Sequence, residues 1–177
     1  VLAQPDVPLE VLIVDDGSTR EPVAAAAARA AWPGTGDLEI LVQPGNQGIE
    51  HALNAGLEWI LTRHYTYIAR LDCGDRNRPG RLARQEAFLD AHPHVLLVGG
   101  AAAFVDQDGV EQFIYRLPTT RAGIVKLMRK NSAFMHPAVM FRVSALALVG
   151  CYDYDVPAAE DYAFFYKFLE AGDVANL

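Results

Sequence analysis

The sequence predicts one α/β domain with a mostly parallel sheet, on three observations. In the first hundred residues, short apolar segments alternate with longer segments that have the spacing of amphipathic helices, which is typical of parallel sheets. Two of the short apolar segments end in aspartates, the first at Asp15 and Asp16 and the second at Asp72 and Asp75. The chain has 177 residues, which is enough to bury a sizeable core in a single domain.

The elements of the first half follow in order. Residues 9–14 form a short, continuous apolar run, as expected for a strand that is buried on both faces. Residues 21–32 are rich in alanine and predict a helix, in which Pro22 is acceptable because it lies in the first turn. The other elements expected here are strands at 38–42, 65–71 and 95–98 and helices at 49–63 and 79–91.

The pattern changes after residue 100. Residues 101–105 and 110–115 flank a polar turn and predict a hairpin. Thr119 or Thr120 can cap the helix that follows. The last expected elements are a helix at 119–130, a strand at 137–141, a short helix at 143–148 and an aromatic-rich helix at 160–171 that ends at Gly172.

Composition and charge restrict the partners. The net charge of −7 argues against nucleic acid, because phosphate backbones are held by clustered Lys and Arg. The two cysteines, Cys73 and Cys151, imply no disulfide framework and indicate the cytoplasm, with peripheral association at the inner face of a membrane as a further option. One local basic patch is predicted, formed by Arg76, Arg78, Arg81 and Arg84.

The strand-ending aspartates are the strongest functional signal. In an open α/β sheet the ligand binds at the carboxyl ends of the strands. Four carboxylates that converge there repel one another unless they meet a cation or hydrogen-bond donors. A metal-bound nucleotide diphosphate supplies both, because its ribose and base carry donors.

Six motifs follow one another in a characteristic order. They are VDDGST, NQGIEHALNAG, YIARLDCGD, RPGRLARQEAFLDAHPHVLLVGG, HPAVMF, and VGCYD followed by AED. In this order they resemble the family 2 glycosyltransferases, most of all the bacterial enzymes that build lipopolysaccharide and capsule.

The resemblance implies the GT-A fold, in which a Rossmann-like nucleotide-binding sheet carries a smaller acceptor-side hairpin and helices. It implies one catalytic domain over 1–177, with a nucleotide-sugar-binding half at 1–100 and an acceptor-side half at 101–177. It also implies that a first strand is missing from this sequence, and that residues 1–4 are the end of a helix that follows that strand.

The resemblance assigns the nucleotide site. Asp15 and Asp16 accept hydrogen bonds from the base and ribose of the donor, and such charge-assisted bonds are strong. The alternative is that one of the two caps the next helix with help from Ser18. The other residues that match nucleotide-binding positions are Asn46, Gly48, Asn54 and Asp72.

The resemblance also implies a divalent metal, Mg²⁺ or Mn²⁺, held by Asp72 and Asp75. The family shows an Asp-x-Asp pattern here, whereas this chain has Gly74 in place of the second Asp. Asp75 can substitute if the loop shifts by one residue, which Gly74 permits. The alternative is that Arg76 or Arg78 stabilises the leaving group, and Cys73 is expected to be a small packed residue.

The family places a catalytic pair at Glu160 and Asp161, with Asp161 as the base. The alternative is simple helix capping, since acidic residues favour a helix N-terminus. His136 is predicted either to line the acceptor side or to be a satisfied core residue. The aromatic residues of the last helix are expected to be mostly core, with one or two rings available to stack on an acceptor sugar.

The function predicted is therefore inverting transfer of a sugar from a nucleotide-diphosphate donor to a hydroxyl of a glycan or lipid-linked acceptor, in cell-surface polysaccharide synthesis. The alternatives are a catalytically impaired sugar-nucleotide-binding domain and a sugar nucleotidyltransferase. A response-regulator receiver is disfavoured, because residues 50–60 contain no Asp for phosphorylation and the chain has no Lys-Pro pair.

Overall fold

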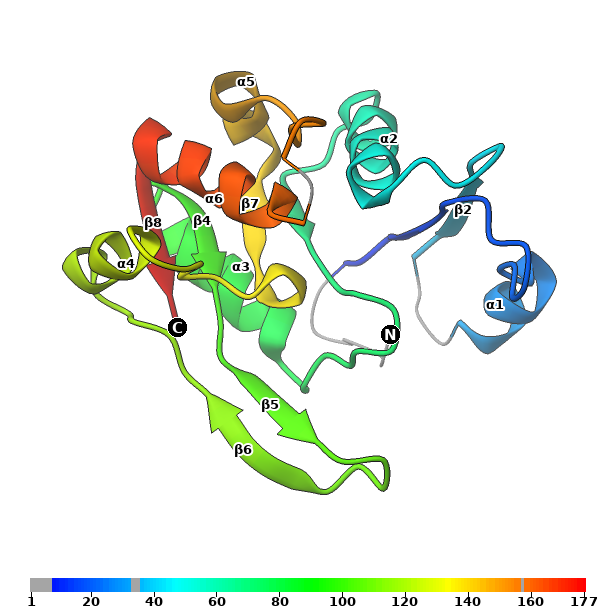
Figure 1. Ribbon diagram of the computed structural model, residues 1–177, viewed down its shortest axis with the longest axis horizontal. Helices are drawn as coiled ribbons and strands as arrows, with labels where there is room; N and C mark the ends of the chain where they lie inside the picture. The colour runs from blue at the N-terminus through cyan, green and yellow to red at the C-terminus, as the bar shows by residue number, and fades with distance from the viewer. Residues whose placement is uncertain (1–7, 33–35, 157) are drawn as a thin grey trace.

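The computed structural model describes residues 8–32, 36–156 and 158–177. Two pieces of sheet form an α/β fold (Figure 1). Strands β1 (Val11–Asp15) and β2 (Leu38–Val42) form a parallel pair. The larger piece has the order β3-β7-β4-β8, formed by β3 (Tyr67–Ala69), β7 (Met140–Arg142), β4 (Val95–Gly99) and β8 (Asp173–Asn176). Within this four-stranded piece β3, β4 and β8 run in one direction and β7 runs against them, so the predicted mostly parallel α/β class is confirmed.

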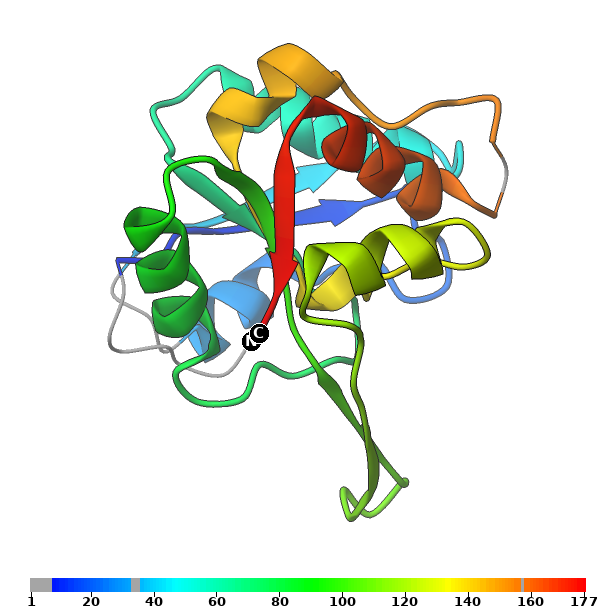
Figure 2. The same cartoon turned by 90° about the vertical axis from the view of Figure 1, so that its left-hand side faces the viewer.

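Helices cover both faces of the four-stranded sheet. The helices are α1 (Ala25–Ala31), α2 (Ile49–Leu61), α3 (Arg81–Ala91), α4 (Arg121–Met128), α5 (Leu146–Val149) and α6 (Glu160–Ala171). Figure 2 shows α3 on one side of the strands and α4 and α6 on the other. The main core lies on the α6 side, where apolar side chains from α4, α6 and the strands are fully buried, among them Leu97, Ile124, Phe141, Phe164, Phe165 and Phe168. The expectation that the aromatic helix is mostly core is thus confirmed.

Helix α2 connects the two sheet pieces. A Cβ on Gly56 would lie 3.2 Å from Cγ2 of Val14, so this glycine lets α2 approach β1 closely. The next residue, Leu57, is buried in the main core together with Ile68 of β3. The position of the loop after β1 relative to the loop after β3 therefore depends on how α2 packs.

The predicted hairpin forms and projects from the body (Figures 1 and 2). Its strands are β5 (Ala102–Val105) and β6 (Glu111–Tyr115), and they pair with each other alone among the described residues. Asp106 closes the turn by accepting hydrogen bonds from the backbone N–H groups of Asp108 and Val110.

Several element boundaries differ from the sequence prediction. The helix expected at 21–32 begins only at Ala25, and the strand expected at 137–141 is a 3-10 turn (His136–Ala138) followed by β7. The short helix near 143–148 starts as a 3-10 turn before α5. Strand β8 was not predicted, because four residues with polar ends become a strand only by pairing with β4. Residues 1–4, where a helix end was expected, lie outside the described residues.

Two further expectations concern exposure and membranes. Cys73 is exposed, so the expectation that it is a packed residue was wrong; it lies in an irregular loop with no element over it. Among the helices that the structure describes, none is both long and apolar enough to cross a bilayer.

Tyr152 joins the two halves of the chain at the centre of the core, through both its backbone and its side chain. Asn54 of α2 binds its backbone with both ends of the amide: Nδ2 donates to the Tyr152 carbonyl at 2.9 Å, and Oδ1 accepts from the Tyr152 N–H at 2.8 Å. The Tyr152 ring stacks on Phe164 with 4.0 Å between centroids. Its hydroxyl lies 2.9 Å from Nε2 of His136.

His136 is buried and neutral. Burial, followed by the neighbouring charge of Arg70, lowers the pKa of His136 to about 3. Arg70 Nε donates to Nε2 of the same ring at 3.3 Å, which requires that this nitrogen carry no proton. The sequence left His136 open between the acceptor side and the core, and the structure places it in the core at 8% exposure.

We expect Asn54→Ala to lower the free energy of unfolding by roughly 2–4 kcal/mol, because it leaves the N–H and carbonyl of Tyr152 buried without partners. The measurement is urea unfolding of the variant beside Asn46→Ala, which removes an exposed asparagine and should leave the midpoint unchanged. Equal midpoints for the two variants would show that the hydrogen bonds between Asn54 and the backbone of Tyr152 do not stabilise the fold.

We expect His136 to make the protein less stable in mild acid. A folded-state pKa near 3 lies below the unfolded value of about 6.5, so the unfolded chain takes up the proton first as pH falls. Between pH 7 and pH 5 this costs roughly 2 kcal/mol of unfolding free energy. Urea unfolding at both pH values should show that loss reduced in His136→Gln and retained in His64→Gln, which changes an exposed histidine. An unchanged pH dependence in His136→Gln would count against this assignment.

Candidate active site

The loop after β1 uses its first aspartate to fix its own backbone. Asp15 is 4% exposed, and its carboxylate accepts from the N–H groups of Ser18 at 2.8 Å and Val23 at 2.9 Å. The hydrogen bonds from Val23 and Ser18 lower the pKa of Asp15, so the group is ionised at neutral pH. These contacts order the loop before α1. They are not the helix cap that the sequence left open as an alternative, because the N-cap residue of α1 is Ala24 and no side chain caps it.

Asp16 joins this loop to the start of α2. Its two carboxylate oxygens accept from the N–H groups of Gln47 and Gly48, each at 3.1 Å. Gly17 has φ +66°, and a Cβ there would lie 2.5 Å from Cα of Gly45, so only glycine allows the two loops to approach this closely. The structure therefore brings Asp16, the exposed Asn46 and Gly48 together, as a shared nucleotide role requires.

Asn54 has a different role from the one expected. It is 2% exposed, and both ends of its amide are occupied by the backbone of Tyr152. A side chain this deeply buried is out of reach of a nucleotide. It positions the loop before α6 instead.

The loop after β3 carries the metal candidates. Asp72 forms an ion pair with Arg70, at 2.8 Å between Oδ1 and Nη2. The N–H of Asp75 donates to the carbonyl of Asp72 at 3.2 Å, which closes a turn. Gly74 within this turn has φ +91°, a conformation that glycine adopts without strain, and no atom lies within 4 Å of a Cβ placed there. Asp75 is exposed, so both carboxylates face a space that a ligand can reach.

Arg70 connects this loop to the core. Its guanidinium binds Asp72 on one side and Nε2 of His136 on the other. Arg81 fixes the backbone of the same segment, because it donates to the carbonyls of Arg70 and Val139, each at 3.0 Å. Neither arginine was singled out for this role, since the sequence shows only that they are basic and not that they are partly buried.

The four arginines at 76, 78, 81 and 84, which the sequence predicts to be a local group of positive charge, do not form a continuous surface. Burial lowers the pKa of Arg81 to about 10, and its guanidinium is turned inward. Arg78 forms an ion pair with Glu111 of the hairpin. Arg84 donates to the carbonyl of Gly80.

Glu160 and Asp161 form the first turn of α6. The residue before the helix, Ala159, offers no side-chain cap, and Ala158 is the one non-glycine residue with positive φ, at +60°, in the part of the chain that the structure describes. Asp161 lies in the first turn of α6, at the N-terminal end of the helix. Its Oδ1 accepts from the N–H of Tyr162 at 2.6 Å, and both acids are partly exposed.

The acidic motifs around 72 and 160 act on the same buried group. Burial raises the pKa of Tyr152, and the carboxylates of Asp161, Asp72 and Glu160 raise it further, while Arg70 lowers it. These acids are far apart in the sequence, yet their fields meet at one phenol. Contacts also link the two segments: Asp72 pairs with Arg70, Arg70 donates to His136, and the ring of His136 contacts Phe165 of α6.

The four strand-ending carboxylates do not form one cluster. Asp15 and Asp16 are each held by two backbone N–H groups, and Asp72 is paired with Arg70. Among the residues described, no group of three or more His, Cys, Asp or Glu side chains could hold a metal ion. The mutual repulsion expected for converging carboxylates is therefore relieved locally, by hydrogen bonds and one arginine.

Two carboxylates still fit a metal that arrives with its ligand. Mg²⁺ commonly binds one or two protein carboxylates together with substrate phosphates, and keeps waters at its other positions. Asp72 and Asp75 provide hard oxygen atoms within one short turn. This donor set suits Mg²⁺ or Mn²⁺ bound to a diphosphate better than a metal held by protein alone.

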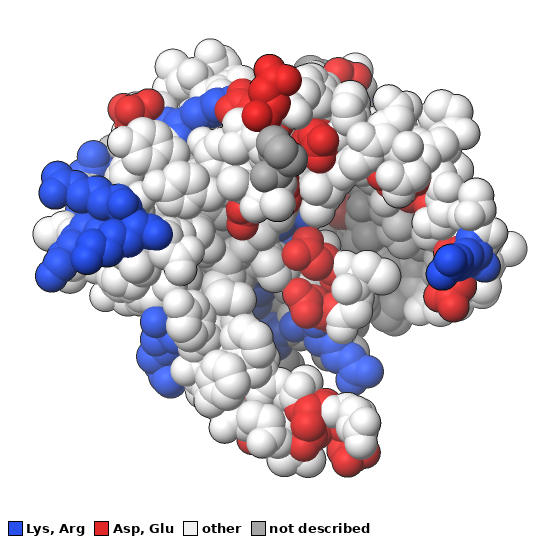
Figure 3. All heavy atoms as spheres, viewed as in Figure 1, with Lys and Arg blue, Asp and Glu red and all other residues white. Residues whose placement is uncertain are grey.

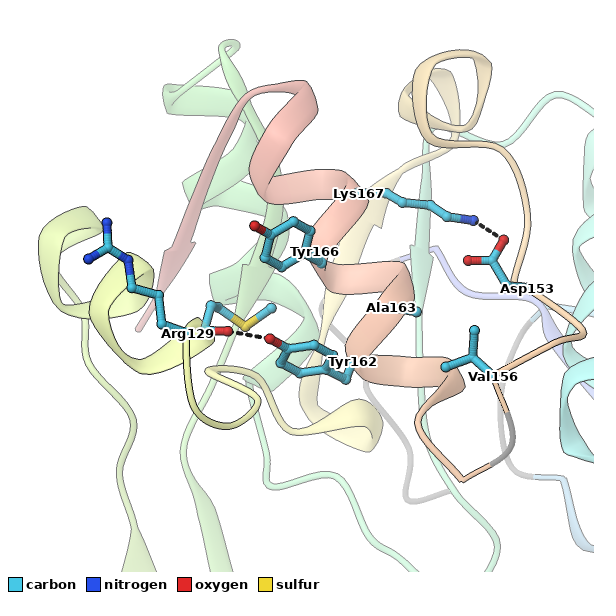
Figure 4. A pocket seen from close by; sticks show the side chains of 8 residues that line it. Arg129, Asp153, Val156, Tyr162, Ala163, Tyr166 and Lys167 are labelled. Carbon is cyan, nitrogen blue, oxygen red and sulfur yellow. Dashed lines mark hydrogen bonds and ion pairs between the residues drawn. The ribbon is translucent and has the colours of Figure 1, made fainter.

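A hollow of about 690 Å³ lies along α6 (Figure 4). Tyr162 and Tyr166 line it with ring centroids 6.2 Å apart, and Lys167 forms an ion pair with Asp153 at its edge. None of the residues predicted to bind the donor lines this hollow. On α6 its lining starts at Tyr162, one residue after Asp161.

Similar proteins agree on the family. Residues 1–149 match the model of "Glycosyl transferase family 2". The amylovoran biosynthesis glycosyltransferase AmsE of Erwinia amylovora is 33% identical over 95% of this chain and 61% of its own length. The UDP-Gal:alpha-D-GlcNAc-diphosphoundecaprenol beta-1,3-galactosyltransferase of Escherichia coli is 28% identical over 93% of this chain and 58% of its own length. The chain thus spans about three fifths of these relatives.

The fold is shared with a solved structure. The mannosyltransferase PcManGT of Pyrobaculum calidifontis, in complex with GDP-Man and Mn²⁺, superposes with a TM-score of 0.63, at 18% identity, over 95% of this chain and 45% of that one. This likeness confirms the predicted GT-A fold. With a family model that matches most of its residues, the chain belongs to glycosyl transferase family 2.

Proposed function

We propose that this protein transfers a sugar from a nucleotide-diphosphate donor to a hydroxyl of a glycan or lipid-linked acceptor, with inversion, in the synthesis of a cell-surface polysaccharide. The observation that carries the proposal is the set of contacts that joins the loop of Asp72 to the helix of Asp161, through Arg70, His136 and Phe165. One acidic loop suits a metal diphosphate and the other suits a proton acceptor, and transfer of a glycosyl group needs both beside one another.

Asp161 is the catalytic base of this proposal. Its carboxylate takes the proton from the acceptor hydroxyl while that oxygen bonds to the anomeric carbon, and the bond from this carbon to the donor diphosphate breaks on the opposite face. One such displacement inverts the configuration. Glu160 lies beside Asp161 in the first turn of α6.

The donor is held by the two loops that follow β1 and β3. Asp16, Asn46 and Gly48 face the nucleoside, and Asp15 orders that loop from beneath. Asp72 and Asp75 would hold Mg²⁺ or Mn²⁺, which when bound stabilises negative charge on the departing diphosphate. Arg70 keeps the carboxylate of Asp72 oriented through its contact with His136.

The acceptor side is the hollow along α6. Tyrosine faces are suited to the C–H faces of a sugar, and Tyr162 and Tyr166 supply two of them next to Asp161. This replaces His136 as the acceptor-side candidate. Two curated relatives are named for polysaccharide or lipid-linked sugar synthesis, which supports an acceptor of this class. Exposed free thiols at Cys73 and Cys151 are in keeping with a cytoplasmic location.

We expect Asp161→Asn to reduce the rate of transfer by a factor of about 10² to 10⁴, because the amide cannot accept the proton. The assay is release of nucleoside diphosphate from a panel of UDP-, GDP- and dTDP-sugars with GlcNAc-diphosphoundecaprenol as acceptor. Donor affinity, measured by calorimetry, should stay within a few-fold of the wild-type value. Glu170→Gln, at an exposed carboxylate of the same helix, is the matched control and should keep full activity. Parallel loss of rate and donor affinity in Asp161→Asn would show a structural role and favour a non-catalytic sugar-nucleotide-binding domain.

We expect a divalent metal to strengthen donor binding, and we expect this gain to require the carboxylates of Asp72 and Asp75. A donor at a hundred times its Kd stabilises the folded state by about 2.7 kcal/mol, which thermal shift detects readily. Mn²⁺ should enlarge the shift given by the matching donor sugar, and Asp75→Asn should remove that gain. Asp108→Asn, in the exposed turn of the hairpin, should leave it intact. A donor shift that is the same with and without Mn²⁺ would favour stabilisation by arginine alone.

A further inference from the structure

Basic residues are concentrated in one part of this acidic chain. Residues 112–152 contain six Lys and Arg and no Asp or Glu, whereas the rest of the chain has nine Lys and Arg against 22 Asp and Glu. A segment with this charge, in a protein of net charge −7, indicates a surface that faces an anionic partner.

The segment places its charge on and beside α4. Arg116 follows β6, Lys126 lies in the last turn of α4, and Arg129 and Lys130 follow it; all four are exposed. Within the described part of the chain, no ion pair engages these four side chains, whereas Arg121 is paired with Asp173. Figure 3 shows Lys and Arg side chains gathered over α4 at the left of the molecule. We call Arg116, Lys126, Arg129 and Lys130 the basic patch.

An apolar face of the hairpin begins where the basic patch ends. The strand register puts Phe104 opposite Phe113, and Tyr115 lies two residues further along on the same face. Phe104 is 44% exposed, Phe113 53% and Tyr115 43%, although each contacts another ring of the set. Large aromatic side chains left half in water are uncommon on a surface that meets only solvent. We call Phe104, Phe113 and Tyr115 the aromatic face.

The basic patch lies close to the proposed chemistry. Tyr162, the residue after Asp161, donates its hydroxyl proton to the carbonyl of Met128 at the end of α4. Arg129 lines the same hollow as Tyr162 and Tyr166 (Figure 4). Whatever the basic patch binds is therefore held within reach of the catalytic turn.

We propose that the basic patch and the aromatic face together dock the protein on a bilayer that contains anionic phospholipid. The inference rests on the proposed function, because a lipid-linked acceptor is presented by such a bilayer. Lys and Arg are attracted to anionic headgroups, and aromatic rings favour the interfacial layer. The acidic turn of the hairpin, with Asp106 and Asp108, stays in water, so the flat side of the hairpin makes the contact and not its tip.

The test is flotation of the protein with vesicles of phosphatidylcholine alone or with phosphatidylglycerol at about a third of the lipid, at low and high salt. Binding should require phosphatidylglycerol and weaken with salt, as for any basic surface. Replacing Arg116, Lys126 and Lys130 by glutamine should lower the partition coefficient by roughly 100-fold, since each basic side chain contributes a factor of about five. Phe104→Ser should lower the binding that remains at high salt.

The matched control carries the same change in charge elsewhere. Arg29, Arg63 and Arg84 are exposed residues of α1, the end of α2 and α3, and their replacement by glutamine should leave vesicle binding near the wild-type level. An equal loss of vesicle binding in both triple variants would show a general effect of net charge and would refute the proposed docking surface. Failure of the wild-type protein to float with anionic vesicles would overturn it too, and point to an acidic protein as the partner.

Donor binding separates this inference from the proposed function. Calorimetry with the nucleotide sugar needs no vesicles and should give the same Kd for the wild type and for the basic-patch variant. Donor binding without vesicle binding would refute the docking surface alone. Vesicle binding without any donor binding would refute the proposed function and leave the surface in place.

Discussion

The hydrogen-bond clamp between Asn54 and the backbone of Tyr152 is the interaction on which the site depends. It fixes α2, and with it the loops after β1 and β2, to the segment that leads into α6. From the other end of Tyr152 the contacts run through His136 and Arg70 to Asp72. A single buried tyrosine therefore sets the relative position of three chain segments that carry the candidate chemistry. Buried polar groups allow few alternative arrangements, because every partner that is lost leaves an unsatisfied group behind.

The charges of the site are compensated unequally, and the difference assigns their roles. Asp15 and Asp16 are satisfied by backbone N–H groups, so they shape the loop after β1 at little electrostatic cost. Asp72 has one arginine, and the exposed Asp75 side chain has no hydrogen-bond or ion-pair partner among the described residues. Asp161 has a helix dipole and a single local hydrogen bond. The least compensated carboxylates are those that a metal diphosphate and an acceptor proton would neutralise.

Much of the fold was readable because its signals are local. The alternation of apolar and helical segments, the turn at Gly74 and the buried stripe of α6 each depend on residues near one another in the sequence. The elements that were missed depend on distant partners. β8 is a strand because β4 offers it hydrogen bonds, and Asn54 is structural because Tyr152 reaches it from far along the chain. Arg81 looked like surface charge, since nothing in its own neighbourhood shows that it is buried.

The sequence by itself determined the class of fold, the order of the acidic motifs and the family that this order resembles. Those follow from composition and spacing, which the chain carries whether or not it is folded. Only the tertiary structure decided which acids meet, which are already satisfied, and which basic residues are free on the surface. Those properties depend on distances between residues far apart in the chain, and packing around Tyr152 sets them.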